Sequence, residues 1–242
     1  MFVHYRTKGF VFKKVDRGES AQLFSVYTKD FGKLKILGRG IRKISSKLRS
    51  GIETFYLSKI EFIQGKSYKT LTGAVVIEKF KDLKKDLEKL NIAYRIAGIL
   101  DDLIKGEEKD KRIWDLLTDV FNKLNDSDFK NPELIYYYFF WNFLSFLGYR
   151  PEMYFCSACG NKLKPEKLYF TPSHGGVICK DCFKDEKSDI EIKPEIVKII
   201  RIIINNNIKI ISRLNIDKKH IKSLKEASDN YYFFLLDISV QN

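Results

Sequence analysis

The chain has 242 residues, 44% of them hydrophobic, which is enough for one large domain or two to three small ones with apolar cores. Its formal net charge of +13 favours a polyanionic partner. No apolar run of signal-peptide length follows the first residues, and the most apolar window, 134–149, falls short of the roughly 20 residues that span a bilayer, so we expect a cytoplasmic protein.

The positive charge is concentrated in the first third of the chain. Residues 1–80 contain seventeen Lys or Arg against six Asp or Glu, residues 81–153 contain twelve against fourteen, and residues 154–242 contain fifteen against eleven. Solubility alone would explain a uniformly basic surface. An asymmetry of this size predicts instead that one domain meets nucleic acid or a membrane surface.

Runs of roughly alternating polar and apolar residues fill the first eighty positions, at 8–13, 21–28, 32–38, 53–62 and 68–80. Turn signals at 16–18 and 29–32 separate the first three runs at hairpin spacing. Five short antiparallel strands predict a small closed barrel, and the OB-fold is the commonest five-stranded version. Periodicity alone leaves an SH3-like barrel open.

The segment 29–49 is a dense cationic run with a single acid, Asp30. Phosphates attract such a cluster through charge and counterion release, which ignores base sequence and weakens with salt. The candidate nucleic-acid contacts are Lys33, Lys35, Arg39, Arg42, Lys43, Lys47 and Arg49. Three nearby rings, Phe31, Phe55 and Tyr56, either stack bases or fill the barrel core.

After Phe80 the hydrophobic period becomes helical. A stripe through Leu83, Leu87, Leu90 and Tyr94 begins it, and helical patterns continue at 96–104 and 113–124. Acidic residues on these helices are expected on solvated faces, because nothing near them supplies a nucleophile or an open metal position. They are Asp101, Asp102, Glu107, Glu108 and Asp110.

An aromatic helix follows this region. Asn131 and Pro132 are good N-cap and first-turn residues for it, and it is expected to end near Gly148.

The only four cysteines form two CxxC pairs, Cys156 with Cys159 and Cys179 with Cys182, separated by nineteen residues. This spacing predicts one tetrahedral zinc site, in which each short loop presents two thiolates to the metal. Two disulfides or four free thiols are the alternatives, and a reducing compartment disfavours the disulfides. Four thiolates leave no open position for water, so the zinc is expected to be structural, with His174 as a loop residue.

The last sixty residues are expected to be helical. The isoleucine-rich stretch 196–211 fits a helical stripe, although its β-branched residues also suit a strand. The stretch 226–237 is expected to form a final helix that packs on the aromatic helix.

Several short motifs resemble, in their order and spacing, the RecO family of bacterial DNA-repair and recombination mediators. They run from Thr7-Lys8-Gly9-Phe10-Val11 through Thr28-Lys29-Asp30-Phe31-Gly32-Lys33 and Gly38-Arg39-Gly40-Ile41-Arg42-Lys43 to Cys156-Ser157-Ala158-Cys159-Gly160 and Lys222-Ser223-Leu224. The resemblance implies an α+β chain: an OB-fold domain at 1–80, then an all-α helical domain at 81–242 with a zinc element inserted at about 154–185.

The same resemblance implies the activity and the partners. Such proteins are not enzymes; they bind single- and double-stranded DNA and anneal complementary strands. They act with RecR, dock the tail of single-strand-binding protein, help load the RecA recombinase, and associate with the nucleoid during repair. A structural adaptor that binds mainly proteins, and an RNA-binding zinc protein, are the alternative functions for this chain.

Overall fold

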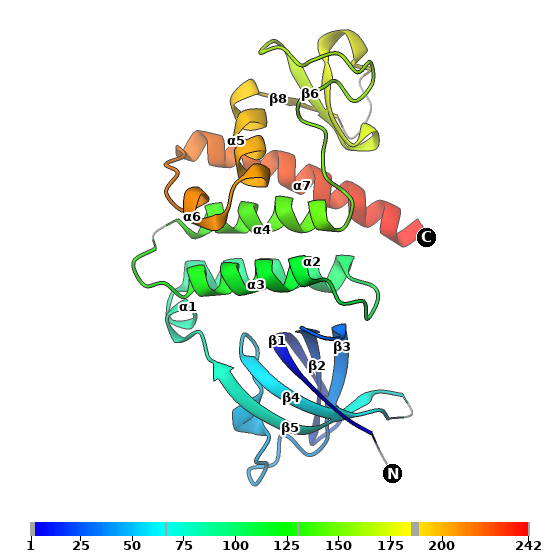
Figure 1. Cartoon of the computed structure of the whole chain (residues 1–242), viewed down its shortest axis with the longest axis vertical. Coiled ribbons are helices and arrows are strands. Elements are labelled where there is room, and N and C mark those ends of the chain that lie inside the picture. The colour runs from blue at the N-terminus through cyan, green and yellow to red at the C-terminus, as the bar shows by residue number, and fades with distance from the viewer. Residues whose placement is uncertain (1–2, 66, 130, 185–188, 242) are drawn as a thin grey trace. The chain divides into compact units, whose positions relative to one another are not determined.

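A closed barrel of five strands forms the first part of the chain in the computed structural model (Figure 1). The structure describes residues 3–65, 67–129, 131–184 and 189–241; for residues 239–241 it describes the backbone alone. The chain divides into two compact units, residues 1–128 and 129–242. The first unit contains three helices in addition to the barrel, so its boundary does not test the predicted domain boundary after residue 80, which stays a prediction.

The barrel strands are β1 (His4–Arg17), β2 (Ala21–Thr28), β3 (Gly32–Gly38), β4 (Leu57–Ile63) and β5 (Lys69–Glu78). They pair in the order β1-β2-β3-β5-β4, with β1 also bonded to β4 and with β3 and β5 parallel. This arrangement is an OB-like barrel, so the predicted fold class is confirmed and the SH3-like alternative is set aside.

Alternation along the strands places one set of side chains inside the barrel. Val11, Phe24, Val26, Leu34 and Ile36 are all buried in its core. A register shift next to Val11 marks a bulge in β1, which bends this long strand around the barrel.

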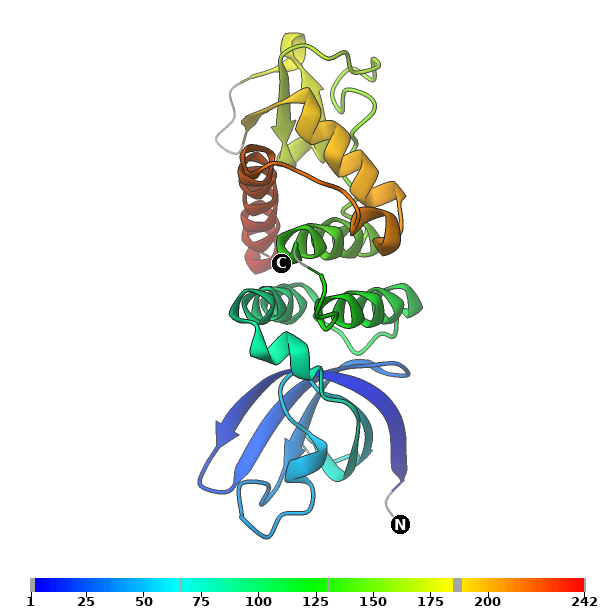
Figure 2. The same ribbon diagram turned by 90° about the vertical axis from the view of Figure 1, so that its left-hand side faces the viewer.

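Three helices complete the first unit: α1 (Lys81–Lys85), α2 (Leu87–Leu103) and α3 (Lys111–Leu124). In both ribbon views α2 and α3 lie side by side across the barrel (Figure 2). They cover the outer face of β1 and β2, because the Phe10 ring packs 5.2 Å from Trp114 and the Tyr27 hydroxyl lies 3.3 Å from the backbone oxygen of Asp110.

The predicted stripe at the start of the helices is confirmed at Leu83, which is buried, and wrong at two of its four positions. Leu87 and Tyr94 are 82% and 56% exposed, whereas the buried face of α2 contains Ile92, Ile96 and Leu100. Asp86 is the reason: its carboxylate accepts the backbone N–H groups of Glu88 and Lys89, so a new helix begins there with a new phase.

The second unit contains α4 (Pro132–Phe146), α5 (Pro194–Asn205), α6 (Ile208–Ile211) and α7 (Lys218–Gln241). The expected packing of the last helix on the aromatic helix is confirmed by Trp141 and Tyr231, whose rings stack 5.8 Å apart. The isoleucine-rich stretch is helical, but it breaks before Asn207, whose side chain caps α6.

A three-stranded sheet is inserted between α4 and α5, in the order β7 (Gly176–Cys179), β6 (Leu168–Thr171), β8 (Ile190–Ile192). The predicted end of the zinc element at residue 185 lies outside the described residues. Among the residues that were described, no helix has the length and apolarity needed to cross a bilayer.

Candidate functional site

The four cysteines come together in the inserted sheet. One candidate ligand atom from each of Cys156, Cys159, Cys179 and Cys182 lies within 4.8 Å of the others. Zinc–sulfur bonds of about 2.3 Å in a tetrahedron put neighbouring sulfurs about 3.8 Å apart. The Sγ atoms of Cys159 and Cys179 are 3.9 Å apart, so the donor set and its spacing fit a tetrahedral thiolate-bound metal.

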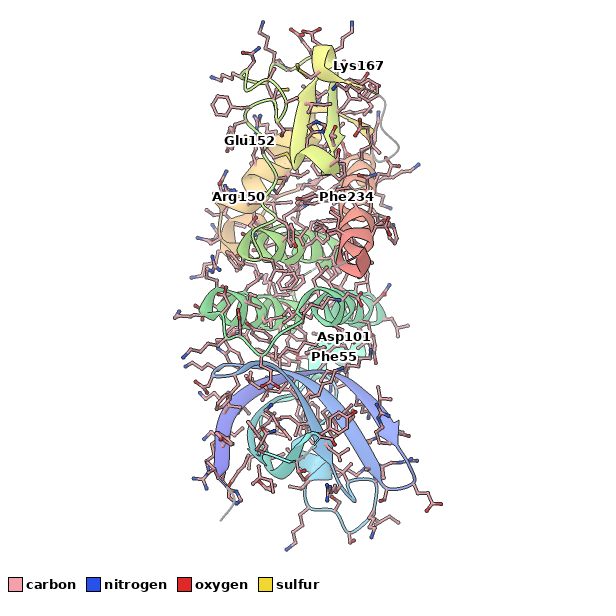
Figure 3. The ribbon with its side chains drawn as sticks, turned by 90° about the vertical axis from the view of Figure 1, so that its right-hand side faces the viewer. Phe55, Asp101, Arg150, Glu152, Lys167 and Phe234 are labelled. Atoms are coloured by element: carbon pink, nitrogen blue, oxygen red, sulfur yellow. The ribbon has the colours of Figure 1, made fainter. Side chains whose placement is uncertain are left out.

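Local backbone geometry builds the two halves of this cysteine site. Gly160 has a φ of +74°, and its N–H bonds to the Cys156 carbonyl at 2.8 Å, which closes the first CxxC turn. Just before this turn, the Glu152 carboxylate accepts the N–H of Tyr154 at 2.6 Å (Figure 3). The second pair lies at the end of β7 and in the 3-10 turn Lys180–Cys182 that follows.

The thiols of the site differ in acidity. Burial raises the pKa of Cys156, but the backbone N–H donors of Cys159, Cys179 and Ala158 outweigh it and lower that pKa to about 6. Hydrogen bonding to Cys179 and Cys159 raises the pKa of Cys182 to about 12. Cys156 is therefore a more acidic thiol than Cys182, and binding of a metal to all four sulfurs requires loss of the Cys182 proton.

Six of the seven predicted nucleic-acid contacts are exposed cations around the β3–β4 connection, and five of these six are unpaired among the described residues. Lys35, Arg39, Lys43, Lys47 and Arg49 have exposed side chains and no ion-pair partner among the residues described. We call residues 39–49 the basic loop. Arg42 belongs to this loop, but its guanidinium pairs with Asp16 at 3.2 Å and donates to the Gly18 carbonyl.

Lys33 has a different environment from its neighbours in sequence. Its side chain is 10% exposed, and its ammonium donates to the carbonyls of Asp101 and Ile104 and contacts the Asp101 carboxylate at 2.9 Å. Asp101 also pairs with Lys13 at 2.6 Å, between α2 and the barrel (Figure 3). Burial raises the pKa of Asp101, but hydrogen bonds from Lys13 and Lys33 outweigh it and hold that pKa below its usual range.

The expectation that the helix acids are solvated is therefore wrong for Asp101 and Asp110, which are partly buried, whereas Asp102, Glu107 and Glu108 are exposed as expected. Asp101 holds two lysines, Glu107 pairs with Lys69 at 2.6 Å, and Asp110 caps α3. The contacts of Asp101 and Glu107 join residues more than thirty positions apart, and no local sequence signal marks them, whereas the Asp110 cap is a local contact with Arg112.

The candidate stacking rings pack within the first unit. Phe55 is 2% exposed and contacts Tyr94 and Phe121, which contradicts a base-stacking role for it. Phe31 packs on Tyr5 and Phe62, and Tyr56 lies under the Lys84 ammonium at 4.0 Å.

Ile44 was not singled out from the sequence. It is 98% exposed in the basic loop, between Lys43 and Lys47. The sequence gives no signal for this exposure, because a single isoleucine in a polar run can equally be a buried core residue.

Comparison with known proteins finds one family that matches both units of the chain. The family profile described as Recombination protein O N terminal matches residues 1–80, and the one described as Recombination protein O C terminal matches residues 84–240. The protein named DNA repair protein RecO from Dehalococcoides mccartyi is 29% identical over 96% of this chain and 91% of its own length. The proteins of the same name from Roseiflexus sp. and Acetivibrio thermocellus are 29% and 26% identical, over 88% and 94% of this chain and 74% and 90% of theirs. The chain therefore belongs to the RecO family.

Proposed function

We propose that this protein is a non-enzymatic mediator of DNA repair and homologous recombination. It binds single- and double-stranded DNA, anneals complementary strands and helps load recombinase onto strands coated with single-strand-binding protein. Its partners are RecR, the tail of single-strand-binding protein and, indirectly, RecA. Such work on chromosomal DNA takes place in the cytoplasm, at the nucleoid.

The observation that carries this proposal is the basic loop. Five exposed cations in the loop and at nearby Lys35 have no ion-pair partner in the described part of the chain, which leaves their charge available to phosphates. Ile44 offers an apolar contact at the same place, as side chains that wedge between bases do in other DNA-binding proteins. The names of the relatives support the repair context.

Helices restrict where DNA can bind on the barrel. OB-folds commonly bind oligonucleotides on the face of strands 2 and 3. In this chain Tyr27 on β2 is 1% exposed and Lys33 on β3 is engaged by Asp101. The proposed DNA surface therefore consists of Lys35, Arg39, Lys43, Lys47 and Arg49, with Arg42 at its edge and Lys33 outside it.

Zinc is proposed as a structural cofactor held by Cys156, Cys159, Cys179 and Cys182. A closed shell of four thiolates supports folding and supplies no open coordination position for chemistry. The metal would fix the two CxxC turns relative to each other within the inserted sheet.

A strand-annealing assay with and without single-strand-binding protein tests this function. The wild type is expected to accelerate annealing of complementary oligonucleotides and to remain active when both are coated. Lys43→Glu with Lys47→Glu should lose this activity. Lys105→Glu with Lys109→Glu, which changes the charge equally, should keep it. Wild-type protein without annealing activity on naked or coated strands would refute the proposal.

A further inference from the structure

We propose that the barrel carries a second binding site for single-stranded nucleic acid, in a groove on the outer face of β1, β4 and β5. The groove has a volume of about 490 Å³ and is lined by Arg6, Lys8, Lys29, Lys59, Ala74 and Val75, among others. The inference rests on the proposed function, because annealing requires two strands to be held at once. We call this site the lysine groove.

Three lysines of the lysine groove are adjacent and share one face. Lys8 lies directly opposite Lys59 in the β1–β4 ladder, and the backbone N–H of Lys29 bonds to the Lys8 carbonyl at 2.9 Å. Directly opposed residues have Cβ atoms about 5 Å apart, and like charges in that arrangement destabilise a sheet. An external anion between the two ammonium groups would remove this repulsion.

Of the two acids of the groove, Glu61 is paired with a cation, whereas Asp30 is bonded to a neutral hydroxyl and keeps its charge, so three lysines face one unpaired carboxylate. Glu61 is held by Arg6 at 3.3 Å and by His4 at 3.0 Å, and Asp30 accepts a 2.7 Å hydrogen bond from the Thr7 hydroxyl. Lys8, Lys29 and Lys59 are exposed, and no described residue forms an ion pair with them. Their charge is therefore available to an outside ligand.

The floor of the groove is small and apolar. Val75 is 65% exposed and lies opposite Lys59 in the β4–β5 ladder. Gly73 follows on the same face, where an added Cβ would lie 3.2 Å from the Cβ of Glu61, so its lack of a side chain keeps the floor open. Cations beside an open apolar floor match a strand of nucleic acid, which combines phosphates with the flat faces of sugars and bases.

The lysine groove and the Arg42 end of the basic loop lie at opposite ends of β2. Arg42 of the loop bonds to Gly18 in the β1–β2 turn, whereas Lys29 begins the β2–β3 turn. The eight residues of β2 separate these turns by roughly 23 Å. The outer face of β2 between them is covered at Tyr27, so the groove is separate from the loop around Arg42, whereas the far end of the loop approaches β5, where Gly51 packs on Ala74.

A bridging experiment on the full chain tests the second site. Donor-labelled and acceptor-labelled oligothymidylates, which cannot pair with each other, are mixed with excess strand, and energy transfer reports two strands on one protein. Anisotropy with limiting strand reports the affinity for the first strand. Three variants are compared: Lys8→Glu with Lys59→Glu, Lys43→Glu with Lys47→Glu, and the control Lys105→Glu with Lys109→Glu. Circular dichroism and thermal melting establish that each is folded.

The groove variant should lose energy transfer while its affinity for the first strand falls by less than about threefold, since only long-range charge changes. The control should retain both signals. If the groove variant shows as much energy transfer as the wild type, there is no second site in the groove. The proposed function would still stand in that case, provided that the loop variant has lost affinity for the first strand. Unchanged strand binding in both variants would refute the loop and the groove together. Binding of an acidic, Phe-containing peptide is measured on the same proteins. If the groove variant loses peptide binding but keeps energy transfer, the groove binds a protein partner and the inference is overturned.

Discussion

Two kinds of lysine from the same cationic run should respond differently to neutralisation. Lys43 and Lys47 are exposed in the basic loop, whereas Lys33 is 10% exposed and bonded to Asp101 and Ile104. We expect Lys43→Gln with Lys47→Gln to weaken binding to single-stranded DNA and to flatten its salt dependence. Lys33→Gln should leave both unchanged and lower stability instead.

The size of each effect follows from these environments. Each phosphate contact adds about 0.7 to the slope of log affinity against log salt, so losing two flattens the slope by about 1.4. Taking 1 M salt as the reference, where the contacts contribute nothing, the variant should bind about 25-fold more weakly than the wild type at 0.1 M salt and about 5-fold more weakly at 0.3 M. Removing the Lys33 ammonium leaves a half-buried carboxylate and two helix-end carbonyls short of a donor, at a cost of about 2 to 3 kcal/mol.

Fluorescence anisotropy over a salt series, combined with urea unfolding, measures both quantities. The decisive comparison is between Lys33→Gln and the double variant at Lys43 and Lys47, since the sequence alone does not distinguish these three lysines. A Lys33→Gln protein that is as stable as the wild type and loses a full phosphate contact from its salt slope would refute the reasoning.

Three further predictions concern stability. Because the pKa of Asp101 is lowered in the folded state, its contribution is present above the unfolded pKa near 4 and is lost as the pH falls through the folded value. Asp101→Asn should therefore destabilise the protein more at pH 7 than at pH 3, as urea unfolding at the two pH values will measure. Cys156→Ser should release the metal and lower the melting temperature before it lowers DNA affinity; metal analysis beside anisotropy checks this order, and a folded, metal-free variant that cannot bind DNA would contradict it. Gly32→Ala should cost more than about 1 kcal/mol in urea unfolding, because φ is +64° there and the new Cβ would lie 2.2 Å from the Glu108 carbonyl oxygen; a wild-type midpoint would argue against this close approach.

Local patterns predicted the barrel well. The expected runs 21–28 and 32–38 coincide with β2 and β3, since alternation and turn residues act over neighbouring positions. The cysteine cluster was predictable for the same reason, as each CxxC pair specifies its own turn. The helix beginning at Asp86 was mis-phased because a cap changed the register within an apparently continuous stripe.

Long-range contacts were not predictable from one sequence. Nothing near Lys33 distinguishes it from Lys43, and the difference arises at Asp101, sixty-eight positions away. Likewise Phe55 looked available for stacking until Tyr94 and Phe121 were seen to pack against it. The lysine groove was hidden because Lys8 and Lys59 become neighbours only when β1 pairs with β4.

The covered outer face of β1 and β2 has a consequence for biosynthesis. The barrel is synthesised before α3, so Phe10 and Tyr27 remain without their cover until Trp114, Phe121 and the rest of α3 have been made. At 5 to 20 residues per second, the stretch from residue 80 to 124 takes roughly 2 to 9 s to synthesise. During that interval the nascent barrel exposes an aromatic face to the cell, so chaperone demand should be greatest just before α3 emerges.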